Sequence, residues 1–175
     1  MGYPVFASGD VLNASDMNAV GLWLVKTQTV GSGVSSVTVT SAFSSTYDNY
    51  LVTYTGGTGI GTSLQLTIGN AATGYYYQLF YAQFAGTTVL ANVGDNNTAR
   101  FTFAGTANTS TYLHANIFTP FLTVPTRVST VYVDATVSGN GTGLLNNNNS
   151  YSSFTITPAA GTLTGGTIRV YGYRN

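Results

Sequence analysis

At 175 residues the chain is long enough to bury a hydrophobic core without disulfides or a structural metal, and a single domain of ordinary size accounts for it. Only ten side chains are charged, five acidic and five basic, far below the roughly 25% of an average globular domain. Because cysteine is absent, the composition excludes a disulfide framework, a thiolate nucleophile and a Cys-based zinc site.

The near absence of charge predicts assembly. A soluble monomer normally keeps apart from its neighbours through surface charge, so a chain of zero net charge indicates a surface occupied by other subunits. Balanced charges also form no basic face, and no nucleic-acid partner is expected. The opening residues MGYPVFASGD contain neither a basic segment nor a long apolar run, so we expect no signal peptide and no membrane span.

The first 30 residues differ from the rest and predict an attachment segment, with residues 31–175 forming a β-domain. Asn13 to Asp16 has the pattern of a capping box, which predicts a short helix over about residues 14 to 20 that stops at Gly21. So short a helix is not stable alone in water. It acts either as a lid on its own domain or as a peg that docks on another protein. The residues expected to attach to a larger particle are Val11, Leu12, Met17, Val20, Leu22 and Trp23.

After Val34 apolar and polar residues alternate with a period of two, and turns rich in Gly or Asn separate the alternating stretches. Strands are predicted at Val37–Thr40, Tyr50–Tyr54, Ser63–Ile68, Tyr75–Phe84, Ala99–Phe103, Thr111–Phe118, Thr126–Val137, Tyr151–Thr157 and Thr167–Tyr173. Short strands at regular spacing, with no helical pattern between them, predict an all-β fold. We expect an antiparallel β-sandwich or jelly roll with a short N-terminal helical segment.

The chain also contains a weak internal repeat. Residues 47–53 (Tyr-x-x-Tyr-x-Val-Thr) resemble residues 151–157 (Tyr-x-x-Phe-x-Ile-Thr), and each copy leads through a Gly/Thr turn into a further strand. The two hairpins are predicted to be equivalent pieces of two facing sheets. Gly56–Gly59 is predicted as a hairpin loop, and Gly139–Gly143 and Asn146–Asn149 as loop tips, because Gly and Asn tolerate positive φ.

Few residues could carry chemistry. One histidine and five scattered aspartates offer no metal-ligand cluster, and Asp95-Asn96-Asn97 fits a surface turn better than a calcium site. Without glutamate, no spacing brings two carboxylates together for glycoside cleavage. His114 lies inside an alternating strand, and no G-x-S-x-G motif offers it a nucleophile. We therefore expect no enzymatic activity and no cofactor.

The densest recognition candidate is aromatic and consists of Tyr75, Tyr76, Tyr77 and Tyr81 in one predicted strand. Tyrosine presents an apolar face and a polar tip, which suits both subunit packing and sugar stacking. Strand alternation sends Tyr75 and Tyr77 to one face and Tyr76 to the other. Core or subunit packing is the main expectation for this cluster, and contact with a ligand is the alternative.

Three stretches resemble a family of tailed-bacteriophage virion structural proteins that are encoded among tail and fibre genes. They are residues 6–18 (FASGDVLNASDMN), residues 43–57 (FSSTYDNYLVTYTGG), and residues 154–158 (FTITP) with 165–174 (GGTIRVYGYR) near the C-terminal end. The first pattern, F-x-x-G-x-V-L-x-A-x-D-x-N, also begins otherwise different phage fibre and tail proteins. Residues 87–108 match nothing in the family.

The resemblance implies a trimeric β-sandwich module of the virion, attached to tail, neck or capsid proteins through its N-terminal segment. The expected function is a fibre-like or tail- or neck-associated appendage that contacts the host surface, with a surface glycan as the partner there. A capsid decoration (cement) protein is the alternative within the same class. A carbohydrate-binding β-sandwich module that acts outside any particle is the alternative from a different class.

Overall fold

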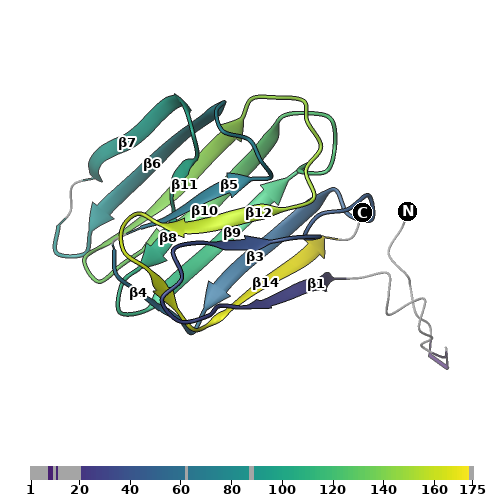
Figure 1. Cartoon of the computed structure of the whole chain (residues 1–175), viewed down its shortest axis with the longest axis horizontal. Helices are drawn as coiled ribbons and strands as arrows, with labels where there is room; N and C mark the ends of the chain where they lie inside the picture. The colour runs from purple at the N-terminus through teal and green to yellow at the C-terminus, as the bar shows by residue number, and fades with distance from the viewer. Residues whose placement is uncertain (1–7, 10, 12–20, 62, 87–88, 174–175) are drawn as a thin grey trace.

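The computed structural model describes residues 8–9, 11, 21–61, 63–86 and 89–173. These residues form fourteen strands and no helix, and the paired strands are antiparallel, so the predicted all-β antiparallel fold is confirmed (Figure 1). The strands are β1 (Leu22–Thr29), β2 (Val37–Val39), β3 (Asn49–Thr55), β4 (Thr58–Gly59), β5 (Leu64–Ile68), β6 (Tyr75–Gln83), β7 (Val89–Thr98), β8 (Phe101–Ala107), β9 (Thr111–Phe118), β10 (Thr126–Val133), β11 (Val137–Leu145), β12 (Phe154–Pro158), β13 (Leu163–Thr164) and β14 (Thr167–Tyr173). The helix predicted over residues 14 to 20 lies outside the described residues.

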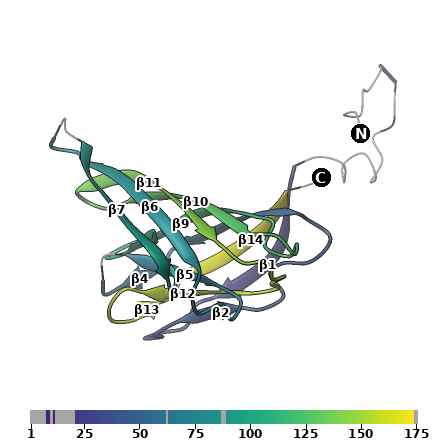
Figure 2. The same cartoon turned by 90° about the horizontal axis from the view of Figure 1, so that it is seen from above.

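The strands make two layers, and the arrangement is sandwich-like (Figures 1 and 2). The large layer has the order β1-β14-β3-β9-β10-β11-β6-β7, and the small layer has the order β2-β12-β5-β8. A hairpin between β8 and β9 joins the layers. The more specific jelly-roll connection stays a prediction.

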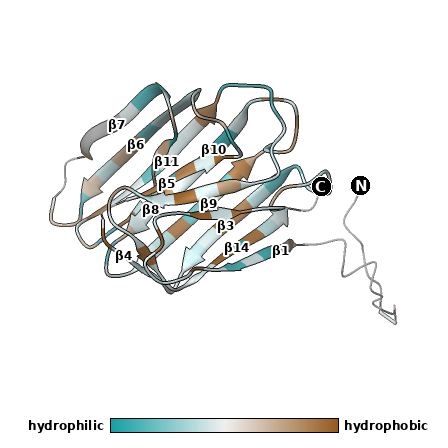
Figure 3. Ribbon diagram, in the orientation of Figure 1, coloured by the Kyte–Doolittle hydropathy of each residue, from teal (hydrophilic) through white to brown (hydrophobic). Residues whose placement is uncertain are grey.

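Strand alternation decides which side chains fill the space between the layers. In β3 the buried residues are Tyr50, Val52 and Tyr54, and β9 and β12 follow the same period of two. The hydropathy colouring shows the result as bands that alternate along β9 (Figure 3). The two buried tyrosines of β3 are satisfied, because the Tyr50 hydroxyl bonds to the backbone of Ser44 and that of Tyr54 donates to the Gly165 carbonyl.

A ribbon with a single register crosses from one layer to the other. In the pairs β3–β14, β4–β13 and β5–β12, the two residue numbers always add to 222. Backbone bonds from Ile60 to Thr162 and from Ala159 to Ser63 fill the gaps in the same register. The two similar stretches predicted as equivalent hairpins therefore pair with each other across both layers. The segment Gly56–Gly59, predicted as a hairpin loop, includes β4 and lies within this ribbon.

Strand β11 corrects the predicted loop at Gly139–Gly143. These glycines alternate on the face toward the small layer, and a Cβ on Gly143 would come closer than 3.0 Å to the buried ring of Phe101 in β8. A Cβ on Gly141 would meet the Thr130 hydroxyl equally closely. The glycines of this segment therefore allow neighbouring groups to approach the strand closely, which is a common reason for glycine within a strand. The predicted loop at Asn146–Asn149 is confirmed.

Several other strands differ from prediction, among them the one expected at Ala99–Phe103, which is Phe101–Ala107 in the structure, and the one expected at Tyr151–Thr157, which is Phe154–Pro158. The strand expected over Thr126–Val137 ends at Val133, because Asp134 accepts bonds from the amides of Thr136 and Val137 and closes a turn before β11. Strand β7 was not predicted, since its Asn, Gly and Asp residues are typical of turns. Strand β1 lies inside the segment predicted for attachment, yet it pairs with β14 over its whole length.

Candidate functional site

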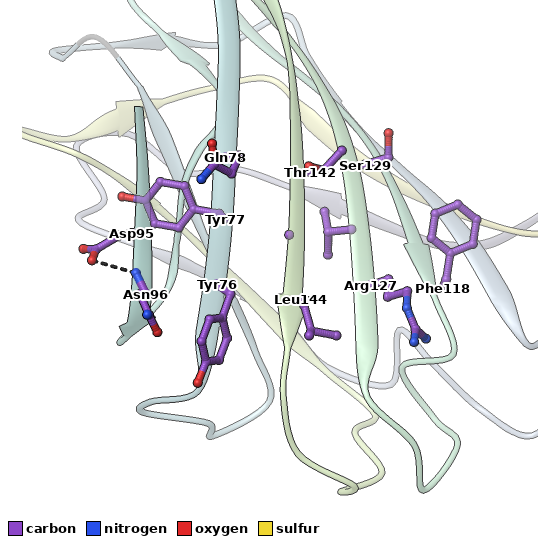
Figure 4. Close-up of a pocket in the computed structure, with 12 residues that line it drawn as sticks. Tyr76, Tyr77, Gln78, Asp95, Asn96, Phe118, Arg127, Ser129, Thr142 and Leu144 are labelled. Carbon is purple, nitrogen blue, oxygen red and sulfur yellow. Dashed lines mark hydrogen bonds between the residues drawn. The ribbon is translucent and has the colours of Figure 1, made fainter. Parts of the chain in front are cut away.

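A hollow of about 630 Å³ lies on the outer face of the large layer, over β9, β10, β11, β6 and β7 (Figure 4). Its volume is within the range of pockets that hold small molecules or short oligomers. Because alternate residues of each strand point to opposite faces, the outward residues of neighbouring strands form rows across it. Two such rows and one wall make the site.

The first row is largely apolar. The pairing registers place Phe118, Arg127, Leu144 and Tyr76 side by side on β9, β10, β11 and β6. Neighbouring strands lie about 4.8 Å apart, so the rings of Tyr76 and Phe118 start from backbones about 14 Å apart. Phe118 is 37% exposed, a large fraction for a phenylalanine in a strand. The row therefore offers two aromatic rings to solvent with a guanidinium and an aliphatic side chain between them.

The second row is polar. Ser129, Thr142 and Gln78 are in register two residues further along the same strands. Their hydroxyl and amide groups line the hollow beside the apolar row, as the close-up shows (Figure 4). Hydroxyls and amides can both donate and accept hydrogen bonds. The floor of the hollow thus has one apolar stripe and one hydrogen-bonding stripe.

The wall comes from β7. Bulges in the β6–β7 pairing, between Tyr75 and Tyr77 and again between Leu79 and Tyr81, strengthen the local bend. They place Asp95 and Asn96 at the rim of the hollow (Figure 4). One carboxylate oxygen of Asp95 accepts a hydrogen bond from the backbone N–H of Asn96 at 2.7 Å, and both side chains are exposed.

The charged group on the floor is Arg127. Its side chain is exposed, and among the described residues it makes no ion pair and no hydrogen bond. The acidic residue that lines the same hollow, Asp95, is on β7, three strands away in the order β10-β11-β6-β7. At about 4.8 Å per strand these backbones are about 14 Å apart. The guanidinium is therefore available to an anionic group that enters the hollow.

The four predicted tyrosines separate. Tyr76 is half-buried on the outer face and lines the hollow, while Tyr77 borders it and has its ring 6.5 Å from that of Phe103. Tyr75 is fully buried, and its hydroxyl accepts the Ile68 amide at 2.8 Å. Tyr75 therefore cannot contact a ligand or another subunit in the folded chain. Tyr81 is half-buried in register with Gly139.

The predicted attachment residues are described only in part. Leu12, Met17 and Val20 lie outside the described residues, and Val11 is 84% exposed. Leu22 is exposed at the start of β1, whereas the half-buried Trp23 points to the other face of the strand. The Trp23 indole nitrogen is buried and has no hydrogen-bond partner in the described part of the chain.

A second hollow, of about 510 Å³, lies beside the tips of the β8–β9 and β10–β11 hairpins, with Tyr112 and Asp134 among its lining residues. The carboxylate of Asp134 is used in the turn, where it accepts the Thr136 amide at 2.7 Å and the Val137 amide at 2.9 Å. Partial burial raises the pKa of Asp134, but these bonds outweigh it and leave the pKa below the ordinary value. This carboxylate is thus a structural group of the hairpin.

The histidine lies apart from the hollow. His114 is half-buried on the outer face of β9, in register with Thr53 and Val131. Within the described ranges, no three His, Cys, Asp or Glu side chains come close enough to hold a metal ion. The first hollow offers aromatic rings, hydrogen-bonding groups, one guanidinium and one carboxylate, which suit the recognition of a ligand.

Over the part of the chain that is described, no helix is long and apolar enough to cross a membrane. No protein-family model matches the sequence, and a search of curated proteins finds no significant match to it.

Proposed function

We propose that this chain is a non-enzymatic structural protein of a tailed-phage virion, a fibre-like or tail- or neck-associated appendage that assembles as a trimer and contacts the host surface. The resemblance in residues 6–18, 43–57 and the C-terminal stretch supports the class of particle. The structural observation that carries the proposal is an open sheet face with exposed apolar side chains on a chain with almost no charge.

That face is the outer side of the large layer. Leu24 on β1 is 56% exposed and Phe80 on β6 is 54% exposed, and both point away from the small layer. Eight strands at about 4.8 Å make the face roughly 35 Å wide, which is broad enough for a standard interface of about 800 Å² per partner. The face carries few charges that could keep copies apart, so contact with other subunits accounts for its exposed apolar side chains outside the hollow, such as Leu24 and Phe80, better than exposure to water does.

Attachment through the N-terminal segment fits the place where the sheet begins. Strand β1 is an edge strand of the large layer, since β14 is its only partner among the strands that the structure describes. The N-terminal segment is therefore joined to the domain at the edge of this layer, through Leu22. The apolar residues predicted for attachment precede or open this strand.

The test is immunogold labelling of purified particles from the phage that encodes the chain, together with mass spectrometry of their proteins. Label at the tail, neck or fibres is expected. Regular label over the head would instead favour the decoration protein, which is the alternative of the same class. Absence of the chain from purified particles would contradict the virion proposal altogether.

The carbohydrate-binding module is retained as a second candidate because one observation favours it, the hollow with two aromatic rings and a row of hydrogen-bonding groups. A module that acts outside any particle would bind sugar and be missing from virions. The same labelling experiment, combined with a binding measurement on the isolated protein, separates the two candidates.

A further inference from the structure

We propose that the hollow over β9, β10, β11, β6 and β7 binds an acidic oligosaccharide, with the sugar carboxylate held by Arg127. This inference deepens the proposed function and rests on it for the source of the ligand, the surface of the host cell. The side chains of the hollow alone determine the binding chemistry.

The apolar row supplies the stacking surfaces. Sugar rings have apolar faces of C–H groups, and exposed aromatic rings are the side chains that contact such faces best. Tyr76 and Phe118 stand at the two ends of the row, with backbones about 14 Å apart. That separation exceeds the length of one sugar ring, so the row fits an oligosaccharide that touches both aromatic residues.

The guanidinium sets the charge of the ligand. Arg127 lies between Phe118 and Leu144 in the row, and it has no acidic partner among the described residues. A guanidinium bonds a carboxylate through two parallel N–H donors, a stronger and more directional contact than a bond to a neutral hydroxyl. A uronate or sialate residue next to Phe118 would meet this group directly.

The remaining polar groups suit sugar hydroxyls. Ser129, Thr142 and Gln78 present hydroxyl and amide groups in the adjacent row, and Asp95 presents a carboxylate at the far wall. Asp95 accepts hydrogen bonds from hydroxyls but repels a second acidic group nearby. The ligand is therefore expected to carry its carboxylate at the Arg127 end and hydroxyls at the Asp95 end.

The test measures binding of the full chain to oligosaccharides that contain glucuronate, galacturonate or N-acetylneuraminate, each paired with its carboxyl-reduced neutral counterpart. A glycan array finds the best pair, and saturation-transfer NMR with titration gives its affinity. The variants are Arg127→Gln and Tyr76→Ala. Arg169→Gln is the matched control, because Arg169 is an outward arginine of the same layer on β14, outside the hollow.

We expect at least one acidic glycan to bind about ten-fold more tightly than its neutral counterpart, and R127Q to abolish that preference while R169Q keeps it. Y76A should weaken the acidic and the neutral member alike. Failure of every acidic glycan to bind, or equal effects of R127Q and R169Q, would overturn the proposal. Altered oligomer size in R127Q or Y76A, measured by sedimentation, would also overturn it and assign the hollow to a subunit contact.

These results are independent of particle membership. Acidic-glycan binding by a chain that is missing from virions would sink the proposed function and leave the binding site standing. A chain found on the tail that binds no acidic glycan would support the proposed function and overturn the binding site.

Discussion

Replacing Gly143 by alanine tests whether the glycines of β11 make room for the small layer. A Cβ at this position would lie closer than 3.0 Å to two ring carbons of Phe101, a distance that real Cβ atoms avoid. The ring cannot move aside freely, because Phe101 is 3% exposed and packs edge-on against Tyr75 with centroids 4.8 Å apart. The substitution therefore forces a shift of either the ring or the strand.

Overpacking of this kind costs about 1 to 3 kcal/mol, and the lower chain entropy of unfolded alanine offsets about 0.4 to 1 kcal/mol of it. We expect Gly143→Ala to lower the free energy of unfolding by about 1 to 2 kcal/mol, which corresponds to a fall of roughly 2 to 8 °C in Tm for a chain of this length. Urea denaturation followed by circular dichroism measures it.

Gly86→Ala is the matched control. Among the described residues, a Cβ there would meet Gln83 atoms alone, at 3.8 Å, and the backbone is not in the left-handed region, so stability should be unchanged or slightly higher. The double variant Gly143→Ala with Phe101→Leu should recover at least about 1 kcal/mol relative to the sum of the single changes, since the smaller side chain frees the space. Equal stability of the Gly143→Ala and Gly86→Ala variants would refute the reasoning.

Three further predictions follow from the burial, the turns and the edge strand. Burial, with the nearby Asp134 carboxylate, raises the pKa of Tyr132 to about 12 from 10.0, so the stabilisation by the protonated Tyr132 is complete below pH 10 and is lost towards pH 12. The urea midpoint of the wild type should therefore fall over this range, and Tyr132→Phe should make the fall smaller. An unchanged fall in the variant would show that Tyr132 does not cause it. Asp134→Ala should lower the free energy of unfolding by about 1 to 2 kcal/mol at neutral pH through the lost turn bonds, whereas Asp134→Asn, which keeps an acceptor oxygen, should lower it less. The pKa of Asp134 is lowered in the folded chain, so its stabilisation is present above its unfolded pKa and fades as the pH falls through its folded pKa. The difference in stability between the wild type and Asp134→Ala should therefore shrink in acid. Removing residues 1–20 leaves β1 in place and should change Tm by less than about 2 °C, while removing residues 1–30 exposes the edge of β14 and should lower Tm by clearly more than that. A large fall in Tm from the shorter deletion would instead make the N-terminal segment a lid on its own domain.

The strands that the sequence predicted well are those in which one face is buried. Residues 50–54, 111–118 and 167–173 alternate because one side of each strand faces the core, and that alternation can be read locally. Strand β7 has few such signals, and its pairing with β6 overrides a composition typical of turns. In β11 the glycines suggested a loop because the groups that explain them lie on other strands, such as the ring of Phe101 beside Gly143 and the Thr130 hydroxyl beside Gly141.

The candidate site was less predictable than the fold. Alternation within the strand placed Tyr76 on the opposite face from Tyr75, but nothing local brings it into one row with Phe118 and Arg127. That row depends on the registers of three separate pairings, and each register is set by core packing on the opposite face. A single arginine in a strand with no other charged residue was the available signal, and it points to Arg127 only once the neighbouring strands are known.

The ribbon that crosses between the layers has a consequence for synthesis of the chain. Strand β14 lies between β1 and β3, and β12 lies between β2 and β5, so the last strands to be made are interior strands of both layers. Neither layer can complete its pairing until these residues have left the ribosome, and their partners in β3 and β5 are about a hundred residues earlier in the chain. A chain truncated after residue 150 would keep most of its strands but would lose the two that its remaining edges need. We therefore expect such truncated chains to aggregate through β1, β3, β2 and β5 and not to fold into a smaller domain.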